Sequence, residues 1–201
     1  MTAKWKRVCR IFGVVVATLW GGAAGAEVLS LESGDRLAMG EGETLSSDVT
    51  VAAGATLTGV GTITGPASVS GLLDPGASPD VAGTLTLAGG VTLATEAVLR
   101  VHVFTNGTAD RLAGSGEAFV LGGTLKAVVP AGYTATTRVF TVLTNSVAFG
   151  GIFSNIAGSR VPACYDDDSQ AGLLLAVSSL PGFSIVLSDA SEISGTVYSI
   201  R

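Results

Sequence analysis

Several residue types that common kinds of chemistry require are scarce in this 201-residue chain. It has one histidine and two cysteines, and aromatic side chains make up 6% of its residues. Cys9 lies in an N-terminal segment that we expect to be removed, so Cys164 would remain alone and no internal disulfide could form. Cys164 has no base near it in the sequence, and His102 has no second histidine with which to bind a metal. The sequence therefore favours neither a catalytic centre nor a cofactor.

Basic residues are few, and more of them are lost with the N-terminal segment. The chain has 11 Lys and Arg against 16 Asp and Glu. Four of the basic residues lie in the first 26 positions, so 7 would remain against 16, a formal charge of −9. Lys126 would then be the only lysine. A surface of this sign repels phosphate groups and anionic lipid, so we expect no nucleic-acid partner.

The first 26 residues are typical of a secretory signal peptide. A basic start precedes an apolar run over residues 11–20, and the sequence Ala-Gly-Ala at 24–26 has the small residues of a cleavage site. The apolar run is too short to span a bilayer, which takes about 20 residues. A signal peptide of this kind would direct the chain to export. Its cleavage before Glu27 would leave no membrane-spanning segment. An uncleaved N-terminal anchor is the alternative.

Long helical patterns are also missing. No window repeats apolar residues at helical spacing, and the dominant signal is a short alternation of apolar residues with Thr or Ser. The 28 glycines disfavour helices, while Val and Thr suit strands. Aromatic residues are too few for the usual core of a β-sandwich, whereas stacked Leu, Val and Ile suit a solenoid. The sequence predicts an all-β parallel β-helix, with an irregular β-sandwich as the alternative.

One stretch, residues 71–93, organises this pattern. It reads GLLDPGASPDVAGTLTLAGGVTL, with short apolar strands separated by a proline-bearing turn and a Gly-Gly corner. Pro75 and Pro79 each remove a backbone donor, so we expect no interior strand to pass through them. Upstream, residues 49–71 contain strand-length fragments between glycine corners about six residues apart, a spacing close to that of β-helix repeats.

The same stretch resembles a known family. LLDPGASPDVAGTLTLAGGVTL is similar to the L-x-P-G-x-S-P-G…G-T-L-T-V-x-G-x-L-T-L signature of the autotransporter-associated β-strand repeat proteins. Asp80 stands where that family usually has a second glycine. Looser matches follow as DRL at 110–112, GGTL at 122–125, FTVL at 140–143 and GIF at 151–153, so the resemblance covers roughly residues 49–177. It implies a bacterial exported protein with a passenger-type, right-handed single-stranded parallel β-helix.

These observations predict four segments. Residues 1–26 are the signal peptide, 27–48 an initial or capping segment, 49–180 the β-helix with a cap-like C-terminal part, and 181–201 a C-terminal extension. A frayed terminus is the alternative for residues 27–48. Residues 145–161 are expected to form a loop whose Phe149 and Phe153 plug the end of the core. The chain would be secreted free or be a fragment of a longer passenger.

Two sets of polar residues are candidates for a site. Alternation over residues 98–104 predicts that Arg100, His102 and Phe104 face outward, with His102 as an exposed surface residue that lacks the partners a function would require. The densest charge cluster is Asp166, Asp167 and Asp168. Neighbouring side chains in an extended segment point apart, so we expect a solvated loop there, with calcium binding as the alternative.

Taken together, the sequence favours a structural or adhesive surface module that is not an enzyme. It would be located at the cell surface, associated with the outer membrane, or extracellular, and would bind extracellular glycans or cell-surface components. Open β-helix ends suggest self-association. The alternative is a secreted polysaccharide-active β-helix enzyme, which would need paired carboxylates on one face. A third interpretation is ice binding through Thr-x-Thr arrays. It would require the Thr62/Thr64 and Thr84/Thr86 pairs to align on successive rungs.

Overall fold

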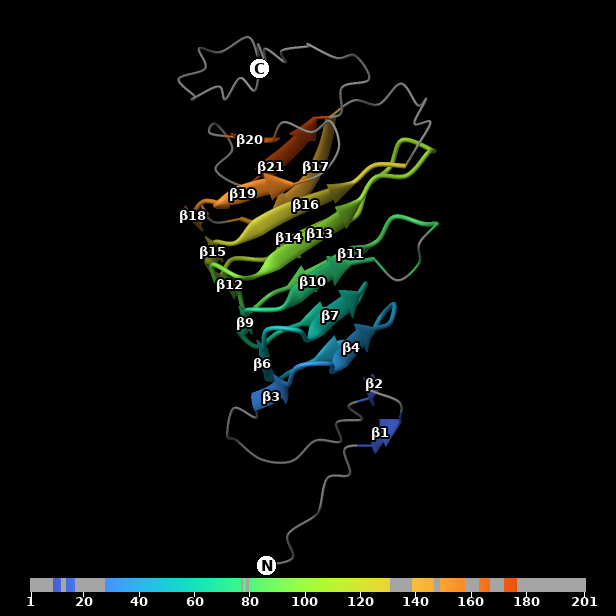
Figure 1. Ribbon diagram of the computed structural model, residues 1–201, viewed down its shortest axis with the longest axis vertical. Coiled ribbons are helices and arrows are strands. Elements are labelled where there is room, and N and C mark those ends of the chain that lie inside the picture. Colours follow the sequence, from blue (N-terminus) through green and yellow to red (C-terminus); the bar gives the residue numbers. More distant parts are fainter. Residues whose placement is uncertain are drawn as a thin grey trace, which may run out of the picture.

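The computed structural model describes residues 9–11, 14–16, 28–76, 78, 80–130, 139–146, 149–157, 163–166 and 172–176. Only the backbone is described at residues 9–11, 14–16, 139, 163–166 and 172–176. The described chain is all β, with short strands that stack into three sheets (Figure 1). Among these residues there is no helix whose length and apolarity would let it cross a membrane.

In each complete turn of the chain that the structure describes, each sheet receives one strand, and further strands at the two ends extend sheets A and C. Sheet A consists of β1 (Cys9–Ile11), β2 (Val14–Val16), β4 (Arg36–Met39), β7 (Thr56–Gly59), β10 (Leu72–Pro75), β13 (Val98–His102), β16 (Thr124–Val128) and β19 (Asn155–Ala157). Sheet B consists of β3 (Val28–Leu31), β6 (Asp48–Val51), β9 (Ala67–Val69), β12 (Val91–Leu93), β15 (Phe119–Leu121) and β18 (Gly150–Gly151). Sheet C consists of β5 (Thr44–Leu45), β8 (Thr62–Ile63), β11 (Thr84–Leu87), β14 (Arg111–Gly114), β17 (Val139–Thr144), β21 (Gly172–Ala176) and β20 (Ala163–Asp166).

The chain visits the three sheets in a fixed order, B, A, C. β3, β4 and β5 therefore form a first rung, β6, β7 and β8 a second, and so on to β18 and β19. The described strand pairings between successive rungs from β3 to β19 are all parallel. One isolated bridge between rungs, from Gly59 to Gly76, is antiparallel. The parallel stacking is the arrangement of a parallel β-helix, and it confirms the predicted all-β solenoid.

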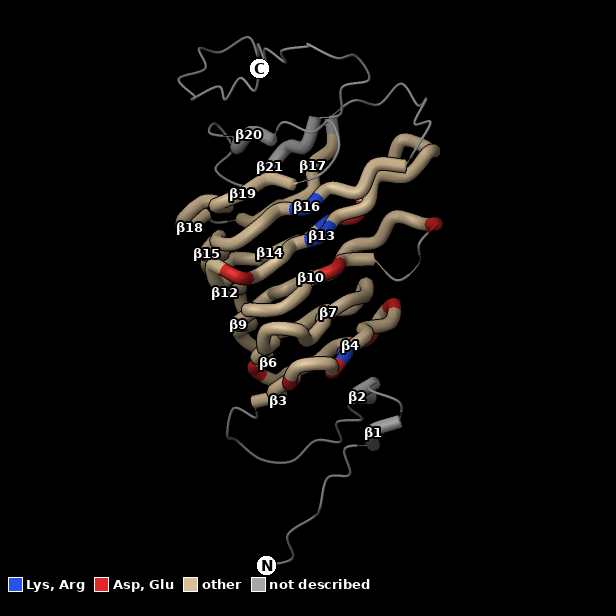
Figure 2. The backbone as a smooth tube through the Cα atoms, viewed as in Figure 1, with Lys and Arg blue, Asp and Glu red and all other residues tan. Residues whose placement is uncertain are grey.

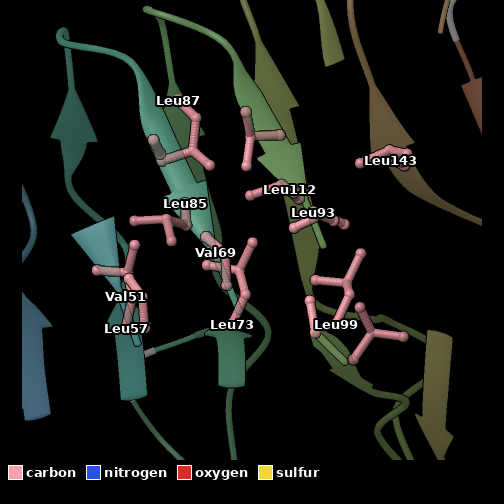
Figure 3. Close-up of a cluster of buried hydrophobic side chains, with 14 of the residues drawn as sticks. Val51, Leu57, Val69, Leu73, Leu85, Leu87, Leu93, Leu99, Leu112 and Leu143 are labelled. Atoms are coloured by element: carbon pink, nitrogen blue, oxygen red, sulfur yellow. The ribbon is translucent and has the colours of Figure 1, made fainter. Parts of the chain in front are cut away.

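Columns of stacked aliphatic side chains fill the space between the sheets (Figure 3). One column in sheet A runs through five consecutive strands, and its registers pair Leu37 with Leu57, Leu57 with Leu73, Leu73 with Leu99 and Leu99 with Leu125. Each of these leucines is at most 3% exposed. Burying such a side chain contributes about 1.5–3 kcal/mol. A register slip of one residue would turn a strand's apolar side chains outward, so these columns fix the pairing.

β10 extends further than the prolines led us to expect. Its last residue, Pro75, pairs with Gly59 of β7 although β10 is an interior strand. On its other side, β10 pairs with β13 only through Leu72 and Leu73. The ladder on that side has ended before Pro75, so the missing N–H interrupts no pairing there.

Two segments contain strands that were not predicted. The expected initial or capping segment contains β3, β4 and β5, whose Leu31, Leu37 and Leu45 are buried, so it is the first rung of the β-helix. The expected loop at 145–161 contains β18 and β19, which continue sheets B and A. Phe153 is buried as predicted, and Phe149 stacks on Phe119 with ring centroids 6.2 Å apart.

The ends of the described chain add antiparallel pairs to the parallel rungs. β20 and β21 pair with each other and β21 pairs with β17, which fits a cap-like C-terminal part. β1 and β2 lie within the predicted signal peptide, pair with each other, and reach β4 through Val14 and Arg36. Cleavage before Glu27 would remove both strands and leave that edge of β4 unpaired. Residues 181–201 lie outside the described residues.

Candidate functional site

The corner between sheets A and C changes along the β-helix. In the second rung, only Val60 and Gly61 separate β7 from β8. In the next two rungs the same corner is occupied by residues 76–83 and 103–110. These two longer loops project together from one side of the molecule (Figure 1). The corner site, as we call it, consists of Asp74, Arg100, His102 and Asp110, which lie at the base of these loops.

An ion pair links two neighbouring strands at this site. Arg100 on β13 donates from Nε to Oδ1 of Asp74 on β10 at 3.0 Å, and from Nη2 to the other carboxylate oxygen. The side chains are 33% and 12% exposed, respectively. This bidentate hydrogen bond raises the pKa of the Arg100 guanidinium. Lys126 on β16 is the register partner of Arg100, and Figure 2 shows the adjacent blue segments on β13 and β16.

His102 lies between two carboxylates. Its Nδ1 is 3.0 Å from Oδ2 of Asp110 and 3.7 Å from Oδ1 of Asp74. The same Oδ2 of Asp110 accepts the backbone N–H of His102 at 3.2 Å. An ionised carboxylate can only accept hydrogen bonds, so Nδ1 must carry the hydrogen. In the neutral ring, Nε2 is then left as a hydrogen-bond acceptor.

Asp110 joins the two loops. Its side chain is 1% exposed, and its Oδ1 accepts the backbone N–H of Gly83 from the preceding rung at 2.9 Å. Arg111 donates its own N–H to the carbonyl of Gly83 at 2.8 Å. Burial raises the pKa of the Asp110 carboxyl, and the hydrogen bonds from Gly83 and His102 oppose that shift only in part.

A shallow depression of about 240 Å³ opens beside His102. It is lined by Asp80, His102, Val103, Phe104, Thr105, Val128 and Pro130. The rings of His102 and Phe104 are tilted against each other with centroids 6.4 Å apart. The corner site and this depression therefore share one side chain, that of His102.

The structure corrects two expectations for this strand. Arg100 and His102 do face outward and alternate with buried Leu99 and Val101, as predicted. Phe104, which was predicted to face outward as well, is 6% exposed, because β13 ends at His102 and the chain turns into a short hairpin closed at Val103 and Ala109. His102 also has the convergent partners that we expected it to lack.

A signal for these partners exists in the sequence. Asn106-Gly107 is a strong turn former, and Asp110 follows His102 by eight residues, so a tight turn between them returns the chain to the histidine. Phe104 accepts the N–H of Gly107 and donates its own N–H to the carbonyl of Thr108, which makes this turn. The link to Asp74 and Gly83 depends on the rung register, which the sequence pattern left open.

The structure describes no side chain of the other predicted candidates. Cys164 and Asp166 lie on β20, where only the backbone is described, and Asp167 and Asp168 lie outside the described residues. In the part of the chain whose side chains are described, no three or more His, Cys, Asp or Glu side chains converge in a way that could hold a metal ion. The calcium hypothesis for the three aspartates stays a prediction.

The outer face of sheet B carries a second regular feature. Ser30, Thr50, Ser68 and Thr92 are register partners on four successive rungs, and all four are exposed. We call this column the hydroxyl ladder. In sheet C, Thr62 pairs with Thr86, so the Thr62/Thr64 and Thr84/Thr86 pairs are offset by two residues. These pairs do not form the aligned array that ice binding would require.

Comparisons with protein-family models, with characterised proteins and with solved structures find no match to this chain.

Proposed function

We propose that this protein is an exported structural or adhesive module of a bacterial cell surface and has no catalytic activity. The hydroxyl ladder is the observation that carries this proposal. It presents four exposed hydroxyl groups one rung apart, on a scaffold whose core columns fix their spacing. A repeating row of hydroxyls on a stiff support suits hydrogen bonding to extracellular glycans or cell-surface components that are themselves repetitive.

Several sequence features support the same proposal. The N-terminal pattern of a signal peptide directs the chain out of the cytoplasm, and residues 72–93 resemble the passenger repeats of autotransporters. We further propose that the β-helix is right-handed, because connections between parallel strands of one sheet are right-handed in nearly all proteins. Such a protein would remain at the cell surface, associated with the outer membrane, or be released outside the cell.

A polysaccharide-active enzyme is the second candidate, and the corner site is the observation in its favour. Asp74 and Asp110 both contact His102, so two carboxylates lie on one face of the β-helix. However, Asp74 is held by Arg100 in a bidentate pair, and Asp110 is almost fully buried and accepts hydrogen bonds from Gly83 and His102. Neither carboxylate is free to act as a general acid or as a nucleophile on a sugar, so we favour the non-catalytic function.

Cell fractionation with surface proteolysis tests the proposal. We expect a cell-attached, protease-accessible chain whose N-terminus is Glu27, and beads coated with the purified chain should adhere to glycan-coated surfaces. A soluble chain in the medium that binds no surface would contradict the adhesive function. Release of reducing sugars from a polysaccharide panel, lost in the Asp74→Asn variant, would establish the enzyme instead. Sedimentation at high concentration tests self-association, and a sharp monomer would count against it.

A further inference from the structure

We propose that the depression beside His102 binds one residue of a neutral glycan. This inference rests on the adhesive function proposed above and assigns to it a second contact, distinct from the hydroxyl ladder on sheet B. A sugar ring needs an apolar surface for its C–H face and polar groups at its edge for its hydroxyls. The depression offers both.

Four of the seven residues that line the depression are apolar. Val103, Phe104, Val128 and Pro130 line it, and they come from two neighbouring rungs. Val128 is the register partner of His102, so these two lining residues lie side by side on β16 and β13. The volume of about 240 Å³ is below the roughly 300–1,000 Å³ of pockets for drug-sized ligands, which suits a single ring.

The other three lining residues, Asp80, His102 and Thr105, are polar. Asp110 holds His102 through Nδ1, which fixes the ring orientation and leaves Nε2 to accept a hydroxyl hydrogen. Nε2 has no hydrogen-bond partner among the described residues. Asp80 is exposed and brings a carboxylate that can accept from two neighbouring hydroxyls. Thr105 adds a hydroxyl that both donates and accepts.

The charges around the depression select against acidic sugars. Asp80 lines the depression, and Asp74 and Asp110 both contact His102, which also lines it. The guanidinium of Arg100, two positions before His102 on β13, is already paired with Asp74. A uronic acid or a sulfated sugar would therefore bring a negative charge to a site without a free cation among its described lining residues. Neutral sugars avoid this repulsion.

Titration with neutral oligosaccharides tests the inference. The purified full chain would be titrated with cellotetraose, mannotriose and chitotriose, with galacturonate trimer as the acidic probe, while methyl and imidazole NMR signals are recorded. We expect at least one neutral probe to shift the Val103 and Val128 methyl signals and the Nε2 signal of His102. In Asp80→Ala the affinity should fall about tenfold or more, and it should be unchanged in Glu41→Ala, which removes an exposed carboxylate from the same corner two rungs earlier, outside the lining of the depression.

Two results would overturn the inference. One is that no neutral probe shifts these signals, and the other is that Asp80→Ala and Glu41→Ala bind equally well. If the chain still adheres to glycan-coated surfaces in either case, the adhesive function stands and only the location of the contact is wrong. Loss of adhesion in the parent chain would instead refute the proposed function itself. A stronger response to the galacturonate trimer than to the neutral probes would overturn the assigned class of sugar.

Discussion

The Nδ1 atom of His102 lies 3.0 Å from Oδ2 of Asp110, and this contact closes the base of the loop at 103–110, which follows the loop at 76–83 of the preceding rung. The other oxygen of the same carboxylate accepts the N–H of Gly83 from that earlier loop. The buried side chain of Asp110 thus links the two loops at the corner between sheets A and C. Its protonation should therefore affect the stability of the fold.

The stability of the protein should depend on pH through Asp110. Burial raises the pKa of this carboxyl in the folded state above its ordinary value of about 3.9. The folded state then binds the proton more tightly than the unfolded state. The stabilisation that results is fully present below the unfolded pKa and is lost as the pH rises through the folded pKa.

Urea unfolding of the parent chain and of Asp110→Asn, over a pH range of about 3 to 6, measures this effect. The parent should lose stability relative to the variant as the pH rises, because the variant has no carboxyl to titrate at this position. His102, which contacts Asp110, and Asp74, which contacts His102, are present in both proteins. A parent that gains stability relative to Asp110→Asn over this range would show that the folded pKa is lowered instead.

The pair formed by Asp74 and Arg100 should be coupled energetically. Removing either partner, in Asp74→Asn or Arg100→Gln, should lower the free energy of unfolding by about 1.5–3 kcal/mol, as for other hydrogen bonds to charged groups. The double variant should cost less than the sum of the two. Lys126→Gln is the control, because Lys126 is exposed, and it should change stability by at most about 0.5 kcal/mol. Additive single effects would mean that the two side chains do not stabilise each other.

Much of this fold could be predicted from the sequence, because the core pattern is local. Alternation in LRVH placed Leu99 and Val101 inside and Arg100 and His102 outside, as the structure has them. The predicted glycine corners and short strands also correspond to the rungs. The prediction for Phe104 failed because the alternation was continued past the end of the strand: β13 ends at His102, where the hairpin closed at Val103 and Ala109 begins.

The corner site was missed for a different reason, because it depends on contacts between rungs. Asp74, His102 and Asp110 are separated by 28 and 8 residues, and only the register between β10 and β13 brings Asp74 to the histidine. Rungs in this chain differ in length: Leu57 lies beside Leu73, 16 positions on, whereas Leu125 lies beside Ile156, 31 positions on. A repeat this irregular gives no fixed period from which to derive such a contact.

The close approach of neighbouring corners should make Gly59 hard to replace. Its φ is +122°, and a Cβ on this residue would overlap the backbone of Met39 in the preceding rung. Gly42 is the matched control, since its φ is +74° and no atom lies within 4 Å of its Cβ position. Gly42→Ala should cost only the backbone strain, about 1–3 kcal/mol. Gly59→Ala should add a steric penalty of about 1–3 kcal/mol to a similar strain.

Thermal or urea unfolding of the two glycine variants compares these costs. If both variants lose the same stability, the approach between the two corners is not close enough to matter. If Gly59→Ala fails to fold, Gly59→Ser should fail in the same way, whereas Gly42→Ala should still fold.

The leucine column offers the sharpest test of the fold, because two adjacent leucines point in opposite directions. Leu73 is fully buried and pairs with Leu57 and Leu99, while Leu72 next to it on β10 lies half-buried on the outer face. Leu73→Ala should lower the free energy of unfolding by about 2–5 kcal/mol, since it removes the branched end of the side chain, Cγ and its two methyl groups, and leaves a cavity. Leu72→Ala should cost at most about 1 kcal/mol. Urea unfolding of both variants gives the comparison, and if Leu72→Ala were the more costly, the strand would have to pair with its other face inward, one residue out of the register described.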